Sequence, residues 1–390
     1  MAEKEIKKIL LAYSGGLDTS VAIKWLQDKY DAEIITYTAH LGQPQDWDAV
    51  EEKALATGAE KAYIDDIREE FITDYVYPAL KVNAMYQEKY PLATALARPL
   101  ISKRMVEIAK KENVDALAHG CTGKGNDQVR FEVSFKALAP EMEVIAPLRD
   151  WEFVSRDAEI EYAEENGISV KATKDSPYSI DQNLWGISIE CGVLEDPWTE
   201  PPADAYQWTK EVDETPDQPK YLTVDFKEGI PVAIDGEEMD PVAIIKKLNE
   251  IGSNYGIGRI DMLEDRLVGI KSREIYEAPA AEILITAHKA LEDLCLDKET
   301  KNYKSQMAAK YAELTYNGFW FSPLRESLDA FVDRSQETVT GSVKLKLYKA
   351  NCTLAGRKSE YSLYDHGLAT YDESDNFDHE SAPGFIKLWG

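Results

Sequence analysis

The first 167 residues alternate short apolar runs with amphipathic stretches. The apolar runs are typical of buried parallel strands, which we expect at residues 9–13, 32–38, 61–64, 115–118 and 144–147. Apolar residues at helical spacing predict helices at residues 19–29, 47–57, 73–86, 102–111 and 156–165. This alternation indicates an α/β domain at residues 1–167, built on a doubly wound, five-stranded parallel sheet with helices on both faces.

The pattern changes after residue 167. Residues 171–220 are rich in Pro, Trp, Asp and Tyr and show weak periodicity. Beyond them we expect a hairpin at residues 221–226 and 232–234, and antiparallel strands at residues 339–348 and 352–354. Helical spacing predicts a helix that opens at Pro241 and further helices at residues 279–296, 304–314 and 323–333. We therefore expect a second, α+β domain at residues 168–370.

The remaining residues, 371–390, form a polar and aromatic C-terminal tail that ends in GFIKLW. Apolar side chains in such a tail should be buried somewhere. They could pack on another subunit or on their own chain, and the sequence leaves both open. We interpret the segment as an oligomerisation tail.

The composition is ordinary for a globular protein except in its charge. Asp and Glu outnumber Lys and Arg by 71 to 44, which gives a formal net charge of −27. Binding to nucleic acid or to an anionic membrane needs a basic face, so we expect neither partner. Surface charge is screened beyond about 8 Å, so we still expect a locally positive crevice around an anionic ligand.

Cysteine and histidine positions argue against metal sites and disulfide bonds. The four cysteines lie far apart with no C-x-x-C pair, and the five histidines lack metal-ligand spacing. No apolar run is long enough for a signal peptide core or a membrane helix. We expect a cytoplasmic protein with no metal held by its own side chains and no tightly bound cofactor.

The sequence LAYSGGLDTS at residues 11–20 ends the first predicted strand and begins the first predicted helix. Ligands bind at the carboxyl ends of the strands in an open parallel sheet. Gly15 and Gly16 allow backbone N–H groups to close on an anion, and neighbouring hydroxyls add donors. Asp18 fits the first helical turn as a cap. We predict a phosphate or pyrophosphate cradle, with an ordinary strand-to-helix turn as the alternative.

Two common phosphate motifs do not fit. A Walker A motif around Gly123 and Lys124 would need Gly and Ser/Thr where Ala118 and Gly125 stand. The dinucleotide fingerprint G-x-G-x-x-G fails because the two glycines of the first loop are adjacent and no third one follows.

A second polar cluster, HGCTGKGNDQVRFE at residues 119–132, follows the fourth predicted strand and should face the same crevice. Thr122, Asn126, Asp127 and Arg130 supply donors, acceptors and both signs of charge. That mixture suits a zwitterionic amino acid better than a bare phosphate. A flexible surface loop is the alternative.

Four segments resemble the argininosuccinate synthase family, within the ATP-pyrophosphatase (adenine nucleotide α-hydrolase-like) superfamily. They are SGGLDTS at residues 14–20, KYPLATALARP at 89–99, GCTGKGNDQVRFE at 120–132 and EDRLVGIKSREIYE at 264–277. The resemblance extends from Ala12 to Trp389. It implies a ligase of arginine biosynthesis that joins L-citrulline to L-aspartate through a citrulline adenylate, with ATP going to AMP and pyrophosphate. It also implies Mg²⁺ on the phosphates of ATP and a homotetramer.

The resemblance implies a role for each matching residue. ATP would be held by Ala12, Tyr13, Ser14, Gly15, Gly16, Leu17, Asp18, Thr19, Ser20, Ala39 and Gly120. Citrulline would be surrounded by Tyr90, Thr94, Asn126, Arg130, Ser179, Ser188, Glu264 and Tyr276. Aspartate would be held by Thr122, Asn126 and Asp127. The expected catalytic residues are Ser14, Asp18 and Asp127. His40 departs from the family, which more often has Asp or Asn there, and this affects only the adjoining nucleotide loop.

The implied chemistry refines these roles. The ureido oxygen of citrulline attacks the α-phosphorus, so the first loop should stabilise charge on the departing pyrophosphate. Arg130 suits the carboxylate of citrulline, because its guanidinium matches two oxygens. Glu264 is a candidate for the ammonium group, with an exposed carboxylate on a helix face as the alternative. The amine of aspartate must lose a proton, and Asp127 and a phosphate oxygen both remain open as its acceptor.

Three other functions share part of this pattern. NAD, GMP and asparagine synthetases have the first loop without the second cluster. A tRNA sulfur transferase would need paired cysteines and a basic face. A non-catalytic nucleotide sensor would need no site for a second substrate. Pyrophosphate release from ATP that depends on citrulline would distinguish the predicted ligase from all three.

Overall fold

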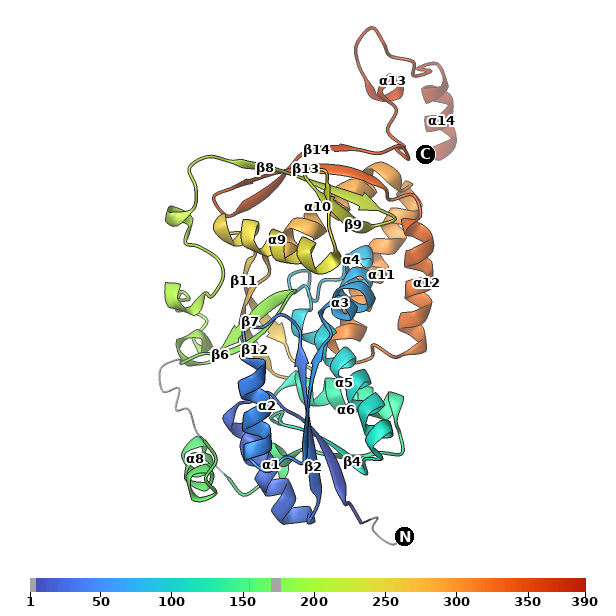
Figure 1. The fold of residues 1–390 in the computed structure, drawn as a ribbon. Coiled ribbons are helices and arrows are strands. Elements are labelled where there is room, and N and C mark those ends of the chain that lie inside the picture. Colours follow the sequence, from blue (N-terminus) through green and yellow to red (C-terminus); the bar gives the residue numbers. More distant parts are fainter. Residues whose placement is uncertain (1–4, 154, 170–176) are drawn as a thin grey trace.

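The structure is a computed structural model that describes residues 5–153, 155–169 and 177–390. Figure 1 shows an α/β layer that contains the N-terminus, a second region of antiparallel strands and helices packed on it, and a C-terminal tail that projects from the far end.

The N-terminal sheet has five parallel strands in the order β3-β2-β1-β4-β5. They are β1 (Lys8–Ala12), β2 (Glu33–His40), β3 (Lys61–Asp66), β4 (Ala116–His119) and β5 (Glu143–Ile145). The prediction of a doubly wound parallel sheet is confirmed. Because the chain order reverses beside β1, a crevice opens between the carboxyl ends of β1 and β4.

Helices cover both faces of this sheet. They are α1 (Leu17–Tyr30), α2 (Trp47–Ala56), α5 (Ala93–Glu112) and α6 (Asn126–Leu138). Two further helices, α7 (Pro147–Asp150) and α8 (Arg156–Glu165), pack against α1. Successive residues of β1 enter two different cores: Ile9 and Leu11 pack in the core that contains α1, and Leu10 packs in the core that contains α5. A strand buried on both faces explains the continuous apolar run in the sequence.

Two predicted helices differ from the structure. The helix predicted at residues 73–86 is a continuous run of α3 (Arg68–Glu70), the π-helix η1 (Phe71–Val76) and α4 (Tyr77–Val82), which ends at Asn83 in the left-handed conformation. The helix predicted at residues 102–111 is the second half of α5, which begins nine residues earlier. The sequence suggested a later start because Pro99 lies inside the helix, where proline removes a hydrogen bond.

An antiparallel sheet in the order β10-β9-β8-β13-β14 lies in the second region. Its strands are β8 (Lys220–Lys227), β9 (Ile230–Ile234), β10 (Glu237–Glu238), β13 (Gly341–Tyr348) and β14 (Asn351–Lys358). Figure 1 shows α9 and α10 packed against it, with α11 and α12 beside them. These helices span Pro241–Asn254, Pro279–Cys295, Lys298–Tyr316 and Pro323–Gln336. The predicted hairpin, helices and C-terminal strands are all present here.

A third sheet, in the order β11-β12-β7-β6, was not predicted. Its strands are β6 (Ser179–Asn183), β7 (Gly186–Glu190), β11 (Arg259–Asp265) and β12 (Lys271–Glu277). Three short 3₁₀ helices follow β7: η2 (Gly192–Glu195), η3 (Ala203–Ala205) and η4 (Val212–Glu214). The sheet lies beside the carboxyl end of the parallel sheet (Figure 1), and it supplies one wall of the site described below.

The tail carries α13 (His366–Ala369) and α14 (Ser381–Trp389), and it extends away from the body (Figure 1). No residue of α14 is buried. Phe385, Ile386, Leu388 and Trp389 are 61% to 89% exposed, so the alternative in which they pack on their own chain is wrong. Within the described part of the chain, no helix combines the length and the apolar character needed to cross a membrane.

Candidate active site

The loop between β1 and α1 is held closely by its neighbours. Gly15 has a φ of +78°, and a Cβ there would lie 3.2 Å from the amide nitrogen of Gln45, so glycine suits this position. The hydroxyls of Ser14 and Thr19 lie 3.1 Å apart, and Lys53 Nζ donates to the Gly15 carbonyl at 2.7 Å. The loop is therefore shaped before any ligand arrives.

The sequence suggested that Asp18 caps α1, but in the structure it does not. The N-cap is Gly16, and no side chain makes the capping hydrogen bond. Asp18 instead lies beside the side chain of Glu159 on α8. Burial, together with the charge of Asp18, raises the pKa of Glu159 to about 7.

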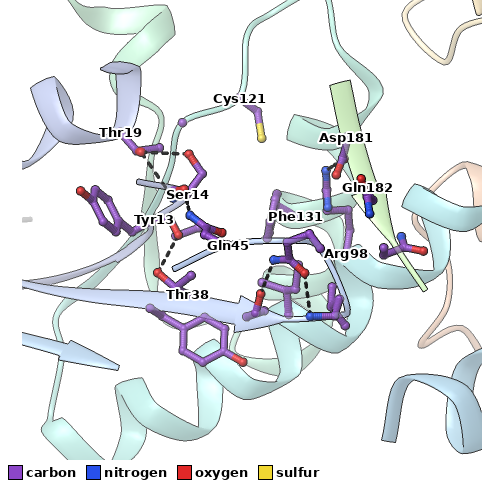
Figure 2. A pocket seen from close by; sticks show the side chains of 18 of the residues that line it. Tyr13, Ser14, Thr19, Thr38, Gln45, Arg98, Cys121, Phe131, Asp181 and Gln182 are labelled. Carbon is purple, nitrogen blue, oxygen red and sulfur yellow. Dashed lines mark hydrogen bonds and ion pairs between the residues drawn. The ribbon is translucent and has the colours of Figure 1, made fainter. Parts of the chain in front are cut away.

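A first cavity of about 490 Å³ opens beside this loop (Figure 2). Six of the residues predicted to bind ATP line it: Ala12, Tyr13, Ser14, Thr19, Ala39 and Gly120. Gly15, Gly16, Leu17, Asp18 and Ser20 are not among its lining residues. Ser20 is buried, and its hydroxyl donates to the Gly16 carbonyl at 2.7 Å.

The unusual residue His40 does not line this cavity. Its ring lies 4.3 Å from the ring of Trp47, and its Nδ1 accepts a hydrogen bond from the Gly42 N–H at 3.3 Å. The neighbouring Ala39 lines the cavity instead. The departure at His40 therefore leaves the lining of the cavity unchanged.

A second cavity of about 390 Å³ adjoins the first. All eight residues predicted to surround citrulline line it: Tyr90, Thr94, Asn126, Arg130, Ser179, Ser188, Glu264 and Tyr276. Thr122, Asn126 and Asp127, predicted to hold aspartate, line it as well. Asn126, Asp127 and Arg130 lie on α6, so the second polar cluster is a short loop followed by a helix rather than one flexible loop.

Glu264 lies on β11 and is only 2% exposed, so the alternative of an exposed carboxylate on a helix face is wrong. Tyr276 and Tyr316 donate hydrogen bonds to its two carboxylate oxygens, each at 2.6 Å. Tyr316 also accepts a hydrogen bond from the Asn126 side chain at 2.7 Å. The sequence did not point to Tyr316, which stands alone at the end of α11 outside every recognised motif.

Arg130 is 4% exposed and only partly satisfied. Its Nε donates to the Tyr316 carbonyl, and its Nη1 donates to Asp127, both at 2.9 Å. Its Nη2 is buried and has no hydrogen-bond partner among the described residues. A buried cationic donor without a partner is costly, so this atom is available to a ligand oxygen.

Arg98 is not among the predicted site residues, although it lies in the KYPLATALARP segment. Its Nη2 donates to Asp127 at 2.8 Å and also contacts Asp181, which lies beside it in Figure 2. Arg98 lines both cavities. Burial alone would raise the pKa of Asp127. The contacts with Arg98 and Arg130 outweigh that effect and hold the pKa below its ordinary range.

Arg266 closes the far side of the second cavity by contacting Glu190 and Glu274, the latter at 2.5 Å. Burial, with the charge of Glu190, raises the pKa of Glu274 to about 8. None of these three residues was among the predicted site residues, although Arg266 and Glu274 lie in the EDRLVGIKSREIYE segment.

The expectation of a locally positive crevice is wrong for the second cavity. Three arginines, 98, 130 and 266, and five carboxyl groups, Asp127, Asp181, Glu190, Glu264 and Glu274, line it. Even with Glu274 protonated because of its raised pKa, four carboxylates face three arginines. Each arginine contacts at least one of these carboxylates. The cations are thereby fixed in place rather than left in excess. Among the described residues, no group of three or more His, Cys, Asp or Glu side chains is arranged to hold a metal ion.

Comparison with known proteins covers nearly the whole chain. Residues 8–169 match the model of the arginosuccinate synthase N-terminal HUP domain, and residues 178–390 match the arginosuccinate synthase C-terminal domain. Argininosuccinate synthase of Chlorobium chlorochromatii is 59% identical over 98% of this chain and 96% of its own. The enzyme of Chlorobaculum tepidum is 58% identical over the same shares.

A solved structure, the U34-tRNA thiolase NcsA from Methanococcus maripaludis, covers 46% of this chain and 63% of its own. It is 19% identical with a TM-score of 0.28, a likeness too small to bear on fold or function.

Proposed function

The chain belongs to the argininosuccinate synthase family, and on that premise we propose how its two cavities divide the substrates. The protein is an AMP-forming carbon–nitrogen ligase of arginine biosynthesis. It joins L-citrulline and L-aspartate to argininosuccinate through a citrulline adenylate, and ATP becomes AMP and pyrophosphate. In our proposal ATP occupies the first cavity and both amino acids occupy the second. The support is that all residues expected around the amino acids line one cavity that adjoins the loop cavity.

ATP enters as its magnesium complex, with the ion on the phosphates. The loop at Ser14 and Gly15 holds the two phosphates that leave, and Ala39 and Gly120 lie near the adenosine. Magnesium prefers oxygen ligands and keeps several waters, which suits the hydroxyl of Ser14 and the carboxylate of Asp18 near this loop. The bound ion would neutralise negative charge on the departing pyrophosphate.

Citrulline binds through both charged ends of its amino acid group. Arg130 Nη2, the buried donor without a partner, takes the carboxylate. Glu264 takes the ammonium group, because its position is fixed by two tyrosine hydroxyls while carboxylate lone pairs remain free. Tyr90, whose ring stacks on Tyr276 at 4.2 Å, stiffens this wall of the cavity.

Aspartate binds at Thr122, Asn126 and Asp127. The low pKa of Asp127 makes it a weak base while both arginines contact it, so we assign it the role of attracting the ammonium group of aspartate. A phosphate oxygen of the adenylate is then the better acceptor for the proton that the amine must lose.

The remaining assignments concern the whole chain. We divide it into a nucleotide domain at residues 1–167, a synthetase domain at residues 168–370 and an oligomerisation tail at residues 371–390. The exposed apolar side chains of α14 support assembly through the tail, and the likeness to the family suggests that the assembly is a homotetramer. The net charge of −27 supports the absence of nucleic-acid and membrane partners. The widely spaced cysteines, with no C-x-x-C pair, support a reducing, cytoplasmic location.

The test uses the full chain with Mg²⁺ and ATP. Pyrophosphate should appear only when citrulline is present, and argininosuccinate only when aspartate is added as well. Arginine is the matched control compound, because it lacks the ureido oxygen and should be inert. Citrulline labelled with ¹⁸O at the ureido oxygen should pass its label to AMP. Pyrophosphate release that needs glutamine, deamido-NAD or tRNA instead of citrulline would overturn the proposal.

A further inference from the structure

The position of the reacting phosphorus follows from the two cavities, if the proposed division of substrates holds. In the adenylate the α-phosphorus is bonded to the nucleotide on one side and to the ureido oxygen of citrulline on the other. It must therefore lie where the nucleotide cavity meets the amino acid cavity. The residues that line both cavities are Ser14, Arg98, Gly120, Cys121 and Asp181. Arg98 is the one cation in this shared set.

The guanidinium of Arg98 lacks one hydrogen-bond acceptor, which a ligand could supply. The side chain is 15% exposed, and both of its ion pairs run through the single atom Nη2, to Asp127 and Asp181. Its Nε is buried and has no hydrogen-bond partner among the described residues. Burying a charged donor without an acceptor costs free energy, so an acceptor that arrives with a substrate would relieve that cost.

We propose that Arg98 is a catalytic residue whose guanidinium contacts a non-bridging oxygen of the ATP α-phosphate and stabilises the charge of the transferring phosphoryl group. The inference deepens the proposed function and rests on it. In this step the ureido oxygen forms a bond to the α-phosphorus, and the bond from that phosphorus to pyrophosphate breaks. The electron pair of the broken bond leaves with pyrophosphate, and Arg98 neither gains nor loses a proton.

The same contact would affect the second substrate. While Arg98 and Arg130 both contact Asp127, that carboxylate is fully compensated. If Arg98 turns toward the α-phosphate, Asp127 keeps one arginine and gains a free lone pair for the ammonium group of aspartate. Arrival of the nucleotide would thus prepare the aspartate site, through one side chain shared by both cavities.

The experiment combines Arg98→Met with the two diastereomers of ATPαS, in which sulfur replaces one or the other non-bridging oxygen of the α-phosphate. Loss of a preorganised cationic donor should lower kcat for citrulline-dependent pyrophosphate release by about 100-fold or more, while KM for ATP and citrulline changes by less than about fivefold. Sulfur at the contacted oxygen should slow the intact enzyme more than the variant. For each enzyme, the rate with one diastereomer is divided by the rate with the other. This ratio should differ about tenfold between the intact enzyme and Arg98→Met.

Arg325→Met is the matched control. Arg325 is 12% exposed, pairs with Asp329 at 2.5 Å and also has a buried Nε without a partner among the described residues, yet it lines neither cavity. It should lower thermal stability and leave the diastereomer ratio unchanged.

The outcomes separate the possible failures. If the intact enzyme releases no pyrophosphate with citrulline, the proposed function fails. If the enzyme is active but Arg98→Met keeps its kcat, or loses it with an unchanged diastereomer ratio, the inference about Arg98 is overturned. If Arg98→Met does not fold, Arg98→Lys decides: its single ammonium should shift the ratio, whereas an unchanged ratio overturns the inference.

Discussion

At the scale of single residues, the site fixes its cations by surrounding them with carboxylates. Arg98 contacts two carboxylates, and Arg266 does the same with a different pair. Such pairs hold a guanidinium in one orientation, at the cost of taking several charges out of water. The site therefore relies on substrates to complete it, because two of its buried guanidinium nitrogens, Nε of Arg98 and Nη2 of Arg130, still lack acceptors in the described structure.

We expect Asp18 to be needed for activity, although its charge beside Glu159 destabilises the folded chain. It lies beside Glu159, whose pKa is raised to about 7 by burial and by this neighbour. A raised carboxyl pKa means that the folded chain holds a proton that the unfolded chain has lost between about pH 4.5 and 7, so stability falls as pH rises through that range. Asp18→Asn should lower pyrophosphate release about tenfold or more. It should also reduce the fall in Tm between pH 5 and pH 8.

Thermal melts at the two pH values and turnover with saturating Mg²⁺ test both halves of this prediction. Glu313→Gln serves as a control, because Glu313 is a half-exposed carboxylate on α11 whose partner Lys310 is equally exposed. Normal turnover in Asp18→Asn would remove Asp18 from the catalytic residues. A Tm profile identical to that of the unsubstituted chain would show that the two carboxylates do not interact.

At the scale of elements, the end of α11 positions the start of α6. Gly318 follows α11 with a φ of +82°, and a Cβ there would lie 3.0 Å from the Cα of Arg130. Tyr316, two residues earlier, accepts the hydrogen bond from Arg130 Nε. The two helices thus meet where both the backbone and the side chain of Arg130 are fixed.

Gly318→Ala should therefore disturb citrulline binding as well as stability. The left-handed backbone disfavours alanine, and the close approach would push α6 aside by a few tenths of an ångström, so we expect a loss of about 1–3 kcal/mol in unfolding free energy. KM for citrulline should rise about threefold or more, because Arg130 moves with the helix. Urea titration and steady-state kinetics measure the two effects.

Gly236→Ala controls for backbone strain alone. Gly236 has a φ of +81°, but nothing lies within 4 Å of the position of its Cβ. The control should lose stability and keep its KM for citrulline. An equal rise in KM in both variants, or in neither, would contradict the role given to the contact between Gly318 and α6.

The burial pattern of each strand explains whether the sequence predicts it. β1 and β2 are buried on both faces, so their apolar runs predict strands directly. β11 and β12 reverse the usual pattern, because Glu264 and Glu274 are buried where apolar residues would be expected. The sequence did not predict β11 and β12 for this reason, and the resemblance pointed to residues on them without predicting the strands. α6 was missed because the glycines and polar residues before it favour a loop.

At the scale of the whole molecule, the net negative charge of the protein has the same sign as the charge of ATP and of aspartate. The net charge is −27, and the amino acid cavity itself has more carboxylates than arginines. Long-range attraction therefore contributes little to the capture of ATP and aspartate. Contact-range donors must do that work, at distances where screening by salt is weak. High net charge disfavours non-specific association, so a specific apolar contact would be the natural means of assembly.

The tail carries apolar side chains that could make such a contact in the proposed assembly. Phe385 and Trp389 stack on each other at 5.4 Å while both remain largely exposed. Burying a side chain of this size contributes about 1.5–3 kcal/mol, so a few of them on each subunit can hold subunits together. Deletion of residues 372–390 should reduce the mass measured by light scattering from that of a tetramer to that of a dimer or monomer. The double variant Phe385→Ser/Trp389→Ser should act in the same direction without shortening the chain. An unchanged mass in both would show that the tail does not mediate assembly, whereas loss of mass with full citrulline-dependent turnover would show that each active site is complete within one subunit.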